Sequence, residues 1–227
     1  MPIQDSKTPV IAQQIAALHH MPIRRLLVVG CGSGEEAAIL GRDLRCDVTG
    51  IDLDGRFDTQ AAKLVRLEVG DATALRFGNG SFDFVYSYHA LEHIPNHRAA
   101  LSEMSRVLCE QGGYCIGTPN RSRLVGYLGS KDATFGQKIE WNLIDWRAKV
   151  TGRFRNEYGA HAGFTKKELQ SDLVASFGQA IDVTLEYYQG VYRRRQSLVK
   201  MLHASGLGHL FFPSIYFIGS KRSIGAG

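Results

Sequence analysis

The stretch LLVVGCGSGEE at residues 26–36 decides the fold of this chain. An unbroken apolar run at 26–29 ends in glycines at alternate positions, and two acids follow directly. Such a run is typical of a strand buried on both faces, as in a parallel sheet. Glycines allow a sharp turn and let backbone N–H groups face a ligand. The stretch predicts a strand, a glycine turn and a helix from Glu35 to Leu44.

Strands and helices alternate outward from this turn. The alternation predicts a Rossmann-like α/β fold with an open, mostly parallel sheet and helices on both faces. Thr165 and Glu168 form a capping box that predicts another helix. Further strands are expected at 47–52, 65–69, 82–87, 114–118, 181–187 and 211–218, and further helices at 10–18 and 95–108.

The length of 227 residues with 44% hydrophobic side chains suits a single domain spanning 1–227. The strand–helix rhythm breaks over 120–162, a segment that holds both tryptophans and is too long for an ordinary loop. We expect an inserted, partly helical lid there.

Charge and cysteine usage limit the function classes. The net charge of +5 is compatible with an anionic small-molecule partner but is far from a basic DNA-binding tail. The four cysteines form no C-x-x-C pair, so no zinc knuckle or redox motif is encoded. No apolar stretch approaches the roughly 20 residues that span a bilayer, and residues 1–20 lack a signal-peptide pattern. We therefore expect a cytoplasmic protein without a transmembrane segment.

The glycine turn departs from the known phosphate-binding turns. The dinucleotide fingerprint needs glycine at its sixth position, where Glu35 stands here, and the P-loop motif is absent. Glu35 and Glu36 in the first helical turn would repel a pyrophosphate. The pattern therefore favours a cationic, phosphate-free nucleoside such as S-adenosylmethionine (SAM).

Two acids at successive strand ends support this interpretation. Asp52 ends the second expected strand, where an acid can accept both ribose hydroxyls. Asp71 follows the third and can accept the adenine amino group. Either acid alone is equally well explained as a helix cap or turn residue.

The chain resembles the class I SAM-dependent methyltransferases, in the small-molecule branch that includes the ubiquinone-biosynthesis O-methyltransferases. The resemblance rests on motifs at 27–34, 50–52, 70–72, 82–85, 89–93, 106–108, 112–113 and 118–120, with a weaker echo at 163–169. It implies a seven-stranded sheet with the last strand antiparallel and SAM across its carboxyl edge. The cofactor-binding residues expected are Gly30, Cys31, Gly32, Gly34, Asp52, Leu53, Asp71, Ala72 and Ser87.

Residues leaving the fourth strand are the candidates for chemistry. His89 is the candidate general base or substrate orienter because histidine titrates near neutral pH; alternatively, it only shapes the cofactor pocket. Tyr88 is the second catalytic candidate, with a packing role as its alternative. His89, Glu92 and His93 also match the inverted zinc-protease motif and, more loosely, a divalent-metal motif of some methyltransferases. We expect no metal, because Pro95 disrupts the ligand helix and a histidine replaces the first glutamate.

The acceptor pocket is expected under the 120–162 lid and an N-terminal helix within 1–22. Aromatic side chains are candidates for its wall or for the lid's own core, and arginines are candidates for holding a carboxylate or phosphate. These residues are Phe135, Trp141, Trp146 and Tyr158, and Arg121, Arg123, Arg147, Arg153 and Arg155. Arg193–Arg195 form a basic cluster that is best explained as a surface turn; contact with an anionic substrate, a lipid headgroup or RNA is the alternative.

These features together predict a SAM-dependent methyltransferase that moves a methyl group to a small-molecule or lipid-linked acceptor, at oxygen, by in-line displacement. Two alternatives stay open: a SAM-binding regulatory or inactive module, and an RNA-directed methyltransferase. The acceptor itself and the choice between monomer and homodimer are left open by the sequence.

Overall fold

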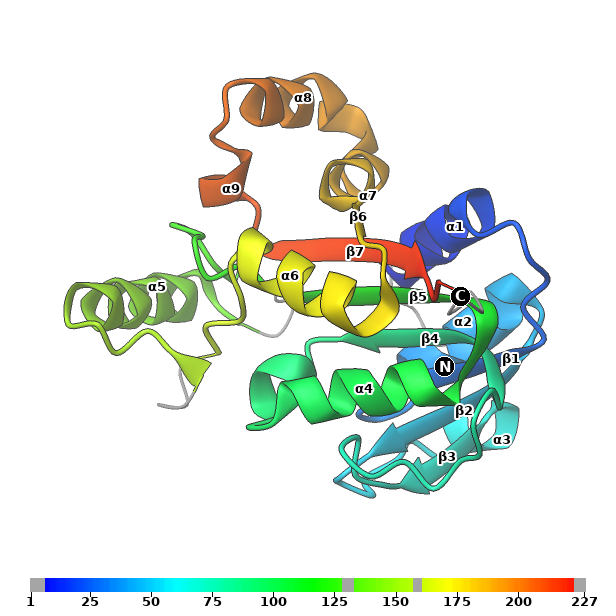
Figure 1. Cartoon of the computed structure of the whole chain (residues 1–227). Helices are drawn as coiled ribbons and strands as arrows, with labels where there is room; N and C mark the ends of the chain where they lie inside the picture. Colours follow the sequence, from blue (N-terminus) through cyan, green and yellow to red (C-terminus); the bar gives the residue numbers. More distant parts are fainter. Residues whose placement is uncertain (1–6, 128–132, 157–160, 223–227) are drawn as a thin grey trace.

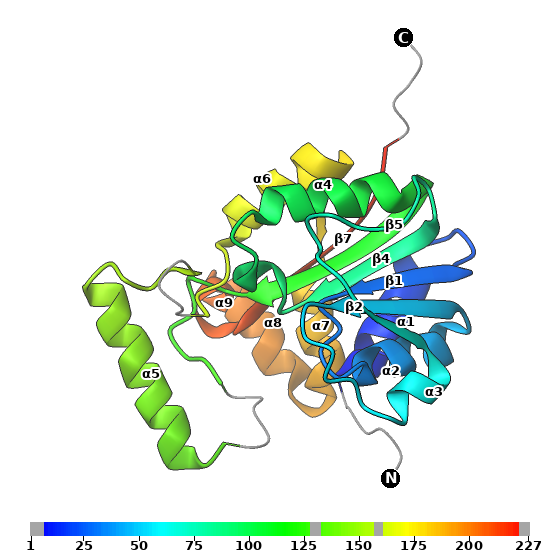
Figure 2. The same ribbon diagram turned by 90° about the horizontal axis from the view of Figure 1, so that it is seen from below.

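The computed structural model describes residues 7–127, 133–156 and 161–222. A central sheet lies between two layers of helices, and one helix stands apart from both (Figures 1 and 2). The seven described strands follow the order β3-β2-β1-β4-β5-β7-β6 across the sheet. They are β1 (Arg25–Val29), β2 (Asp47–Asp52), β3 (Arg66–Val69), β4 (Phe82–Tyr88), β5 (Leu108–Pro119), β6 (Ile181–Asp182) and β7 (Ser214–Ser220).

The strand directions confirm the expected fold. Strands β1 to β5 pair in parallel, and β7 runs antiparallel to both β5 and β6. Val29, the last residue of β1, lies opposite Ile51 of β2 on one side and Ser87 of β4 on the other. The glycine turn therefore leaves the sheet where strand order reverses, which is where open α/β sheets bind ligands.

The alternation of side chains along β1 builds a separate core on each face. Leu26 and Val28 pack into one buried cluster with α1 (Thr8–Leu18), α2 (Glu35–Leu44) and α7 (Thr184–Val191). Leu27 and Val29 pack into the other, with α4 (His97–Val107) and α6 (Lys166–Phe177). The remaining elements are α3 (Ala61–Leu64), η1 (Leu91–His93), α5 (Phe135–Val150), η3 (Arg193–Arg195), α8 (Gln196–Ala204) and α9 (Gly208–Phe211).

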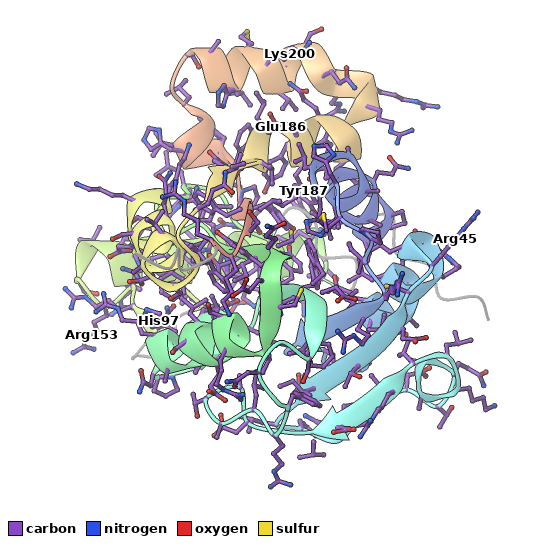
Figure 3. The ribbon with its side chains drawn as sticks, turned by 45° about the vertical axis from the view of Figure 1, so that its right-hand side comes forward. Arg45, His97, Arg153, Glu186, Tyr187 and Lys200 are labelled. Atoms are coloured by element: carbon purple, nitrogen blue, oxygen red, sulfur yellow. The ribbon has the colours of Figure 1, made fainter. Side chains whose placement is uncertain are left out.

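The strand expected at 181–187 is wrong beyond residue 182. Asp182 accepts a hydrogen bond from the backbone N–H of Thr184 at 2.9 Å, and helix α7 begins there. Val183, Tyr187 and Tyr188 are buried at the spacing of a helix face, and Tyr187 points toward the sheet (Figure 3). The strand expected at 211–218 likewise begins only at Ser214, because 208–211 is helical.

The 120–162 segment, for which we expect a lid, contains helix α5. Thr134 and Gln137 form a capping box at its start. A buried ion pair fastens α5 to the segment after β5: Arg123 Nη2 lies 3.1 Å from Asp145 Oδ2. Arg123 also donates to the backbone carbonyls of Asn120, His161 and Ala162, so its charge is fully partnered.

We predict that Asp145→Ala detaches α5, because it leaves the Arg123 charge buried without its partner. Breaking a buried pair in this way typically costs about 3–5 kcal/mol. Amide hydrogen exchange should rise over 135–150 and stay unchanged in β1 and β4. Glu140→Ala on the same helix, where the side chain is exposed, is the matched control and should change nothing. Unchanged exchange in the Asp145 variant would contradict the role of this ion pair.

Candidate active site

The glycine turn holds a backbone shape that ordinary residues avoid. Gly30 has a φ of +73°, and a Cβ added to it would come within 2.2 Å of Ala90 Cβ. The glycine turn therefore lies directly against the segment that follows β4. Gly32 has a φ of +52° with nothing within 4 Å of its absent side chain, so the space above it is open to a ligand.

Asp52 fixes the shape of this turn from the neighbouring strand. Its Oδ2 accepts the backbone N–H of Gly32 at 2.8 Å, and its Oδ1 accepts that of Asp54 at 3.0 Å. A carboxylate offers about four acceptor positions, so two remain for an incoming ligand. Asp52 is half-buried, and the neighbouring Leu53 is 73% exposed, which leaves both within reach of a bound nucleoside.

The other expected cofactor residues differ in how accessible they are. Asp71 is exposed, and its Oδ1 accepts both the backbone N–H and the hydroxyl of Thr73 at 2.8 Å. These bonds hold the pKa of Asp71 below its usual range. Ala72 is buried beside it. Ser87 is fully buried and donates to the Val29 carbonyl at 3.0 Å, so it braces β4 against β1.

The cysteine within the turn is chemically quiet. Burial, and next the neighbouring Asp52 carboxylate, raise the pKa of the Cys31 thiol to about 12. The thiol therefore stays neutral at physiological pH and is a poor nucleophile.

His89 lies where three strands and a short helix meet. Its backbone has a φ of +52°, in the left-handed region that a non-glycine residue rarely adopts, and its N–H donates to the Gly117 carbonyl at 3.0 Å. Nε2 lies 3.2 Å from the Ser214 hydroxyl, and Nδ1 lies 3.3 Å from Glu92 Oε1. With 41% of its side chain exposed, the ring is fixed in position and still reachable.

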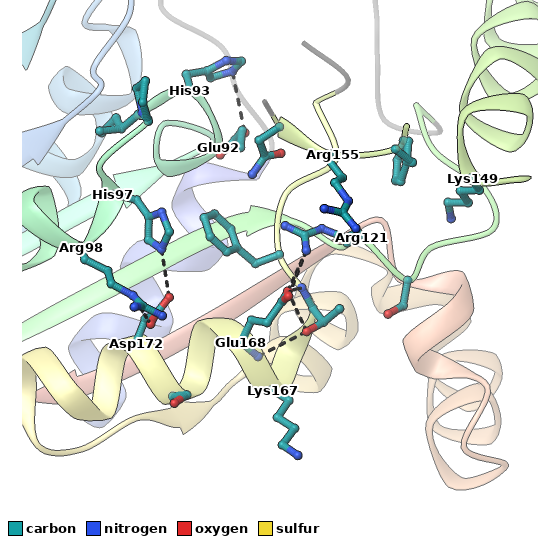
Figure 4. Close-up of a pocket in the computed structure, with 18 of the residues that line it drawn as sticks. Glu92, His93, His97, Arg98, Arg121, Lys149, Arg155, Lys167, Glu168 and Asp172 are labelled. Carbon is teal, nitrogen blue, oxygen red and sulfur yellow. Dashed lines mark hydrogen bonds and ion pairs between the residues drawn. The ribbon is translucent and has the colours of Figure 1, made fainter. Parts of the chain in front are cut away.

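Glu92 is a buried carboxylate in an unusual position. Its side chain is fully buried, and neither oxygen has an aligned hydrogen bond from any described residue. Its neighbours are the rings of His89 and His93, with Nε2 of His93 at 3.9 Å from Oε1 (Figure 4). His161 packs edge-on against His93. Within the described part of the chain, no group of three or more His, Cys, Asp or Glu side chains is placed so that it could hold a metal ion.

Tyr88 packs edge-on against the His89 ring, with ring centroids 4.0 Å apart, and lies partly buried against the core. It stacks on Tyr216 with ring centroids 5.3 Å apart, and burial raises the pKa of its hydroxyl to about 12. It therefore stays protonated at neutral pH and cannot act as a base there. This supports the packing role for Tyr88 over a part in proton transfer.

A large cavity of about 1450 Å³ opens beyond the carboxyl ends of β4 and β5 (Figure 4). Glu92 and His93 line it from the β4 side, and Arg121 from the β5 side. His97 and Arg98 both contact Asp172 at 3.0 Å, which joins α4 to α6 along one wall. The lid contributes Lys149, Gly152, Phe154, Arg155 and Asn156.

The residues expected around the acceptor are placed differently. The aromatic side chains lining the cavity are Phe154 and Phe164, whereas Phe135, Trp141 and Trp146 do not line it, and Tyr158 lies outside the described residues. Helix α1 packs against α2 and α7 and contributes no residue to the cavity.

The expected arginines fall into two groups. Arg121 contacts Glu168 at 3.0 Å and Arg123 is buried against Asp145, so both charges are already partnered. Arg155 is exposed on the cavity wall, and Arg147 and Arg153 are exposed on the lid. Arg193–Arg195 form η3, which has no buried side chain and lies outside the cavity.

Residues 27–116, which hold the turn, Asp52 and His89, match the family described as "Methyltransferase domain". The matched segment runs from β1 into β5. Among curated proteins, it is 36% identical over 101 residues to 2-methyl-6-phytyl-1,4-hydroquinone methyltransferase of Synechocystis sp., and 35% identical over 100 residues to demethylmenaquinone methyltransferase of Staphylococcus aureus. These matches cover 42% and 40% of this chain, and 31% and 41% of the relatives.

Solved structures extend the likeness of the methyltransferase domain to the whole fold. Geranyl diphosphate C-methyltransferase from Streptomyces coelicolor A3(2), in complex with Mg²⁺, geranyl diphosphate and S-adenosyl-L-homocysteine (SAH), superposes with a TM-score of 0.55. The superposition covers 94% of this chain and 77% of that one, at 17% identity. Among the described residues, no helix has the length and apolarity needed to cross a membrane.

Proposed function

We propose that this protein transfers the methyl group of SAM to the oxygen of a small-molecule or lipid-linked acceptor. The observation that carries the proposal is the open space above Gly32 in the glycine turn. Asp52 holds this turn by a hydrogen bond, at the point where strand order reverses. The curated relatives are named for methyl transfer to a hydroquinone and to demethylmenaquinone, which supports an acceptor of quinone-like chemistry.

The residues at the turn fit SAM better than a nucleotide cofactor. Glu35 and Glu36 open α2 directly after the turn, so the helix start is already negative and disfavours a pyrophosphate. The same acids favour the positive charges of SAM. In this proposal Asp52 accepts the ribose hydroxyls with its two remaining acceptor positions, and Asp71 with Ala72 holds the adenine.

The protein's share of the chemistry is alignment and exclusion of water. SAM supplies a methyl carbon that is already activated by its sulfonium, so an acceptor oxygen must be held in line with the carbon–sulfur bond. The contact between Gly30 and Ala90 puts the turn and the β4 exit side by side. His89 and the glycine turn do not line the large cavity, which begins on the β4 side at Glu92 and His93. We assign the acceptor to this cavity, with its reacting hydroxyl reaching past Glu92 to His89 and residues 149–156 as the outer wall.

His89 has the geometry of a general base for an acceptor hydroxyl. Nδ1 lies 3.3 Å from the Glu92 carboxylate without an aligned hydrogen bond, and Nε2 lies 3.2 Å from the Ser214 hydroxyl. In this proposal the proton of the neutral ring is on Nδ1, beside that carboxylate, and Nε2 is free to accept one. An acceptor hydroxyl that takes the place of Ser214 at Nε2 can transfer its proton there as the carbon–oxygen bond forms. Glu92 is then the positioning residue that fixes the tautomer and offsets the charge on the ring.

We predict that Gly32→Val abolishes SAM binding, because the new side chain fills the open space above the turn and strains a backbone at φ +52°. Isothermal titration calorimetry with SAM should show heat for the wild type and none for the variant. Gly206→Val is the matched control: its φ is +74°, its surroundings are equally open and it lies in the loop after α8. Equal SAM affinity in the Gly32 variant would contradict the proposed site.

We predict that His89→Ala slows turnover about 100-fold or more while SAM affinity stays unchanged, because the contribution of a general base is of that size. SAH release, measured by mass spectrometry over a panel of phenol, catechol and hydroxyquinone acceptors, reports the rate. Tyr88→Phe keeps the ring that packs against His89 and removes a hydroxyl that stays protonated at neutral pH, so it should leave the rate within about threefold. A His89 variant that methylates at the wild-type rate would overturn the assigned role.

A further inference from the structure

Helix α5 carries an apolar stripe that faces solvent. The stripe consists of Phe135, Ile139, Leu143, Trp146 and Val150, spaced four, four, three and four residues apart. This spacing puts all five side chains on one face of a helix. Phe135 is 80% exposed and Val150 is 89% exposed, and the other three are each about half exposed. Isolated exposed apolar residues are ordinary, but an aligned stripe of five indicates an interaction surface.

Four of the five stripe residues lie away from the side of α5 that holds the helix to the protein, and Trp146 lies at the border, where its Nε1–H donates to the Leu124 carbonyl at 2.6 Å. Asp145 is buried against Arg123, and Trp141 packs edge-on against Tyr127. In both ribbon views α5 stands away from the sheet and its two helical layers (Figures 1 and 2). At about 1.5 Å per residue, its 16 residues present a rod about 24 Å long.

The charges around the stripe are mostly positive. Between residues 133 and 156, Glu140 and Asp145 are the described acids, and Asp145 is neutralised by Arg123. Basic side chains in the same range are Lys138, Arg147, Lys149, Arg153 and Arg155. Arg153 projects outward at the edge of the molecule (Figure 3). An apolar stripe flanked by cations is the pattern of a helix that lies in the interface of an anionic membrane.

We propose that α5 docks this protein on an anionic lipid surface, with the stripe buried among the acyl chains and the exposed Arg147, Arg153 and Arg155 on the headgroups. Lys149 instead donates to the Arg123 carbonyl. A second copy of the chain fits less well, because pairing two such segments brings their excess positive charge together. Lys149 and the adjoining residues Phe154 and Arg155 also line the large cavity. Resting on the proposed function, this assigns the acceptor to the lipid-linked class, delivered from the membrane to that cavity.

The chain offers an internal probe for the test. Its two tryptophans, Trp141 and Trp146, both lie in α5, so all tryptophan fluorescence reports on this helix. Titration with vesicles of phosphatidylglycerol and phosphatidylcholine should shift the emission to the blue, and pure phosphatidylcholine vesicles should not. High salt should weaken the partitioning, because the headgroup attraction is screened. Brominated lipid should quench Trp146, measured in a Trp141→Phe background.

Paired variants separate the stripe from general surface apolarity. Phe135→Ser with Val150→Ser should weaken partitioning about tenfold or more, because these two side chains are the most exposed of the five. Leu64→Ser with Met201→Ser, which removes exposed apolar side chains from α3 and α8, should leave partitioning unchanged.

Three results would overturn the proposal. One is no partitioning to anionic vesicles, and another is partitioning that the stripe variant leaves intact. The third is a concentration-dependent dimer of the wild type in sedimentation equilibrium that is absent in the stripe variant. That result would mean that the stripe binds a second copy of the chain. Calorimetry with SAM in the absence of vesicles keeps the two proposals separate. Normal heat of SAM binding without partitioning to vesicles would contradict only the proposed docking surface. Absence of that heat would contradict the proposed function.

Discussion

The hydrogen bond from the Gly32 N–H to the Asp52 carboxylate is the contact on which the candidate site depends. It joins the turn after β1 to the end of β2, and the same carboxylate also accepts the N–H of Asp54. The turn keeps its shape because one acid satisfies backbone donors from two loops. That shape leaves open space above Gly32 beside a half-buried carboxylate. Such a space suits a bound nucleoside, whereas tight turning alone does not require it.

The rest of the fold brings chemistry to that turn. Parallel pairing of β1 with β4 places the β4 exit beside the glycines, and the contact between Gly30 and Ala90 closes the gap between them. His89 is then held by β5 through Gly117, by β7 through Ser214 and by η1 through Glu92. A strained backbone that is held from three sides is typical of a functional residue, because the surroundings must maintain the unfavourable φ.

The sequence predicted the parallel half of the fold and the glycine turn before α2 well, because apolar runs and glycines are local signals. It failed where the determinants are tertiary. Residues 181–187 contain β-branched and aromatic residues typical of a strand, yet a helix begins at Thr184. Asp182 accepts the N–H of Thr184, and Tyr187 packs into the core beside the sheet. Ser214 lies 125 residues from His89, and no local pattern connects the two. The lid aromatics were expected around the acceptor, but α5 turns Phe135 toward solvent.

A crystal structure of the protein with SAH would test the central claim most directly. The account predicts both ribose hydroxyls on the Asp52 carboxylate, the methionine end along Gly30–Gly34, and the sulfur directed toward His89 and the large cavity. Two results would contradict the account. One is density for the nucleoside elsewhere, and the other is a complex in which Asp52 contacts only Gly32 and Asp54 and not the ribose.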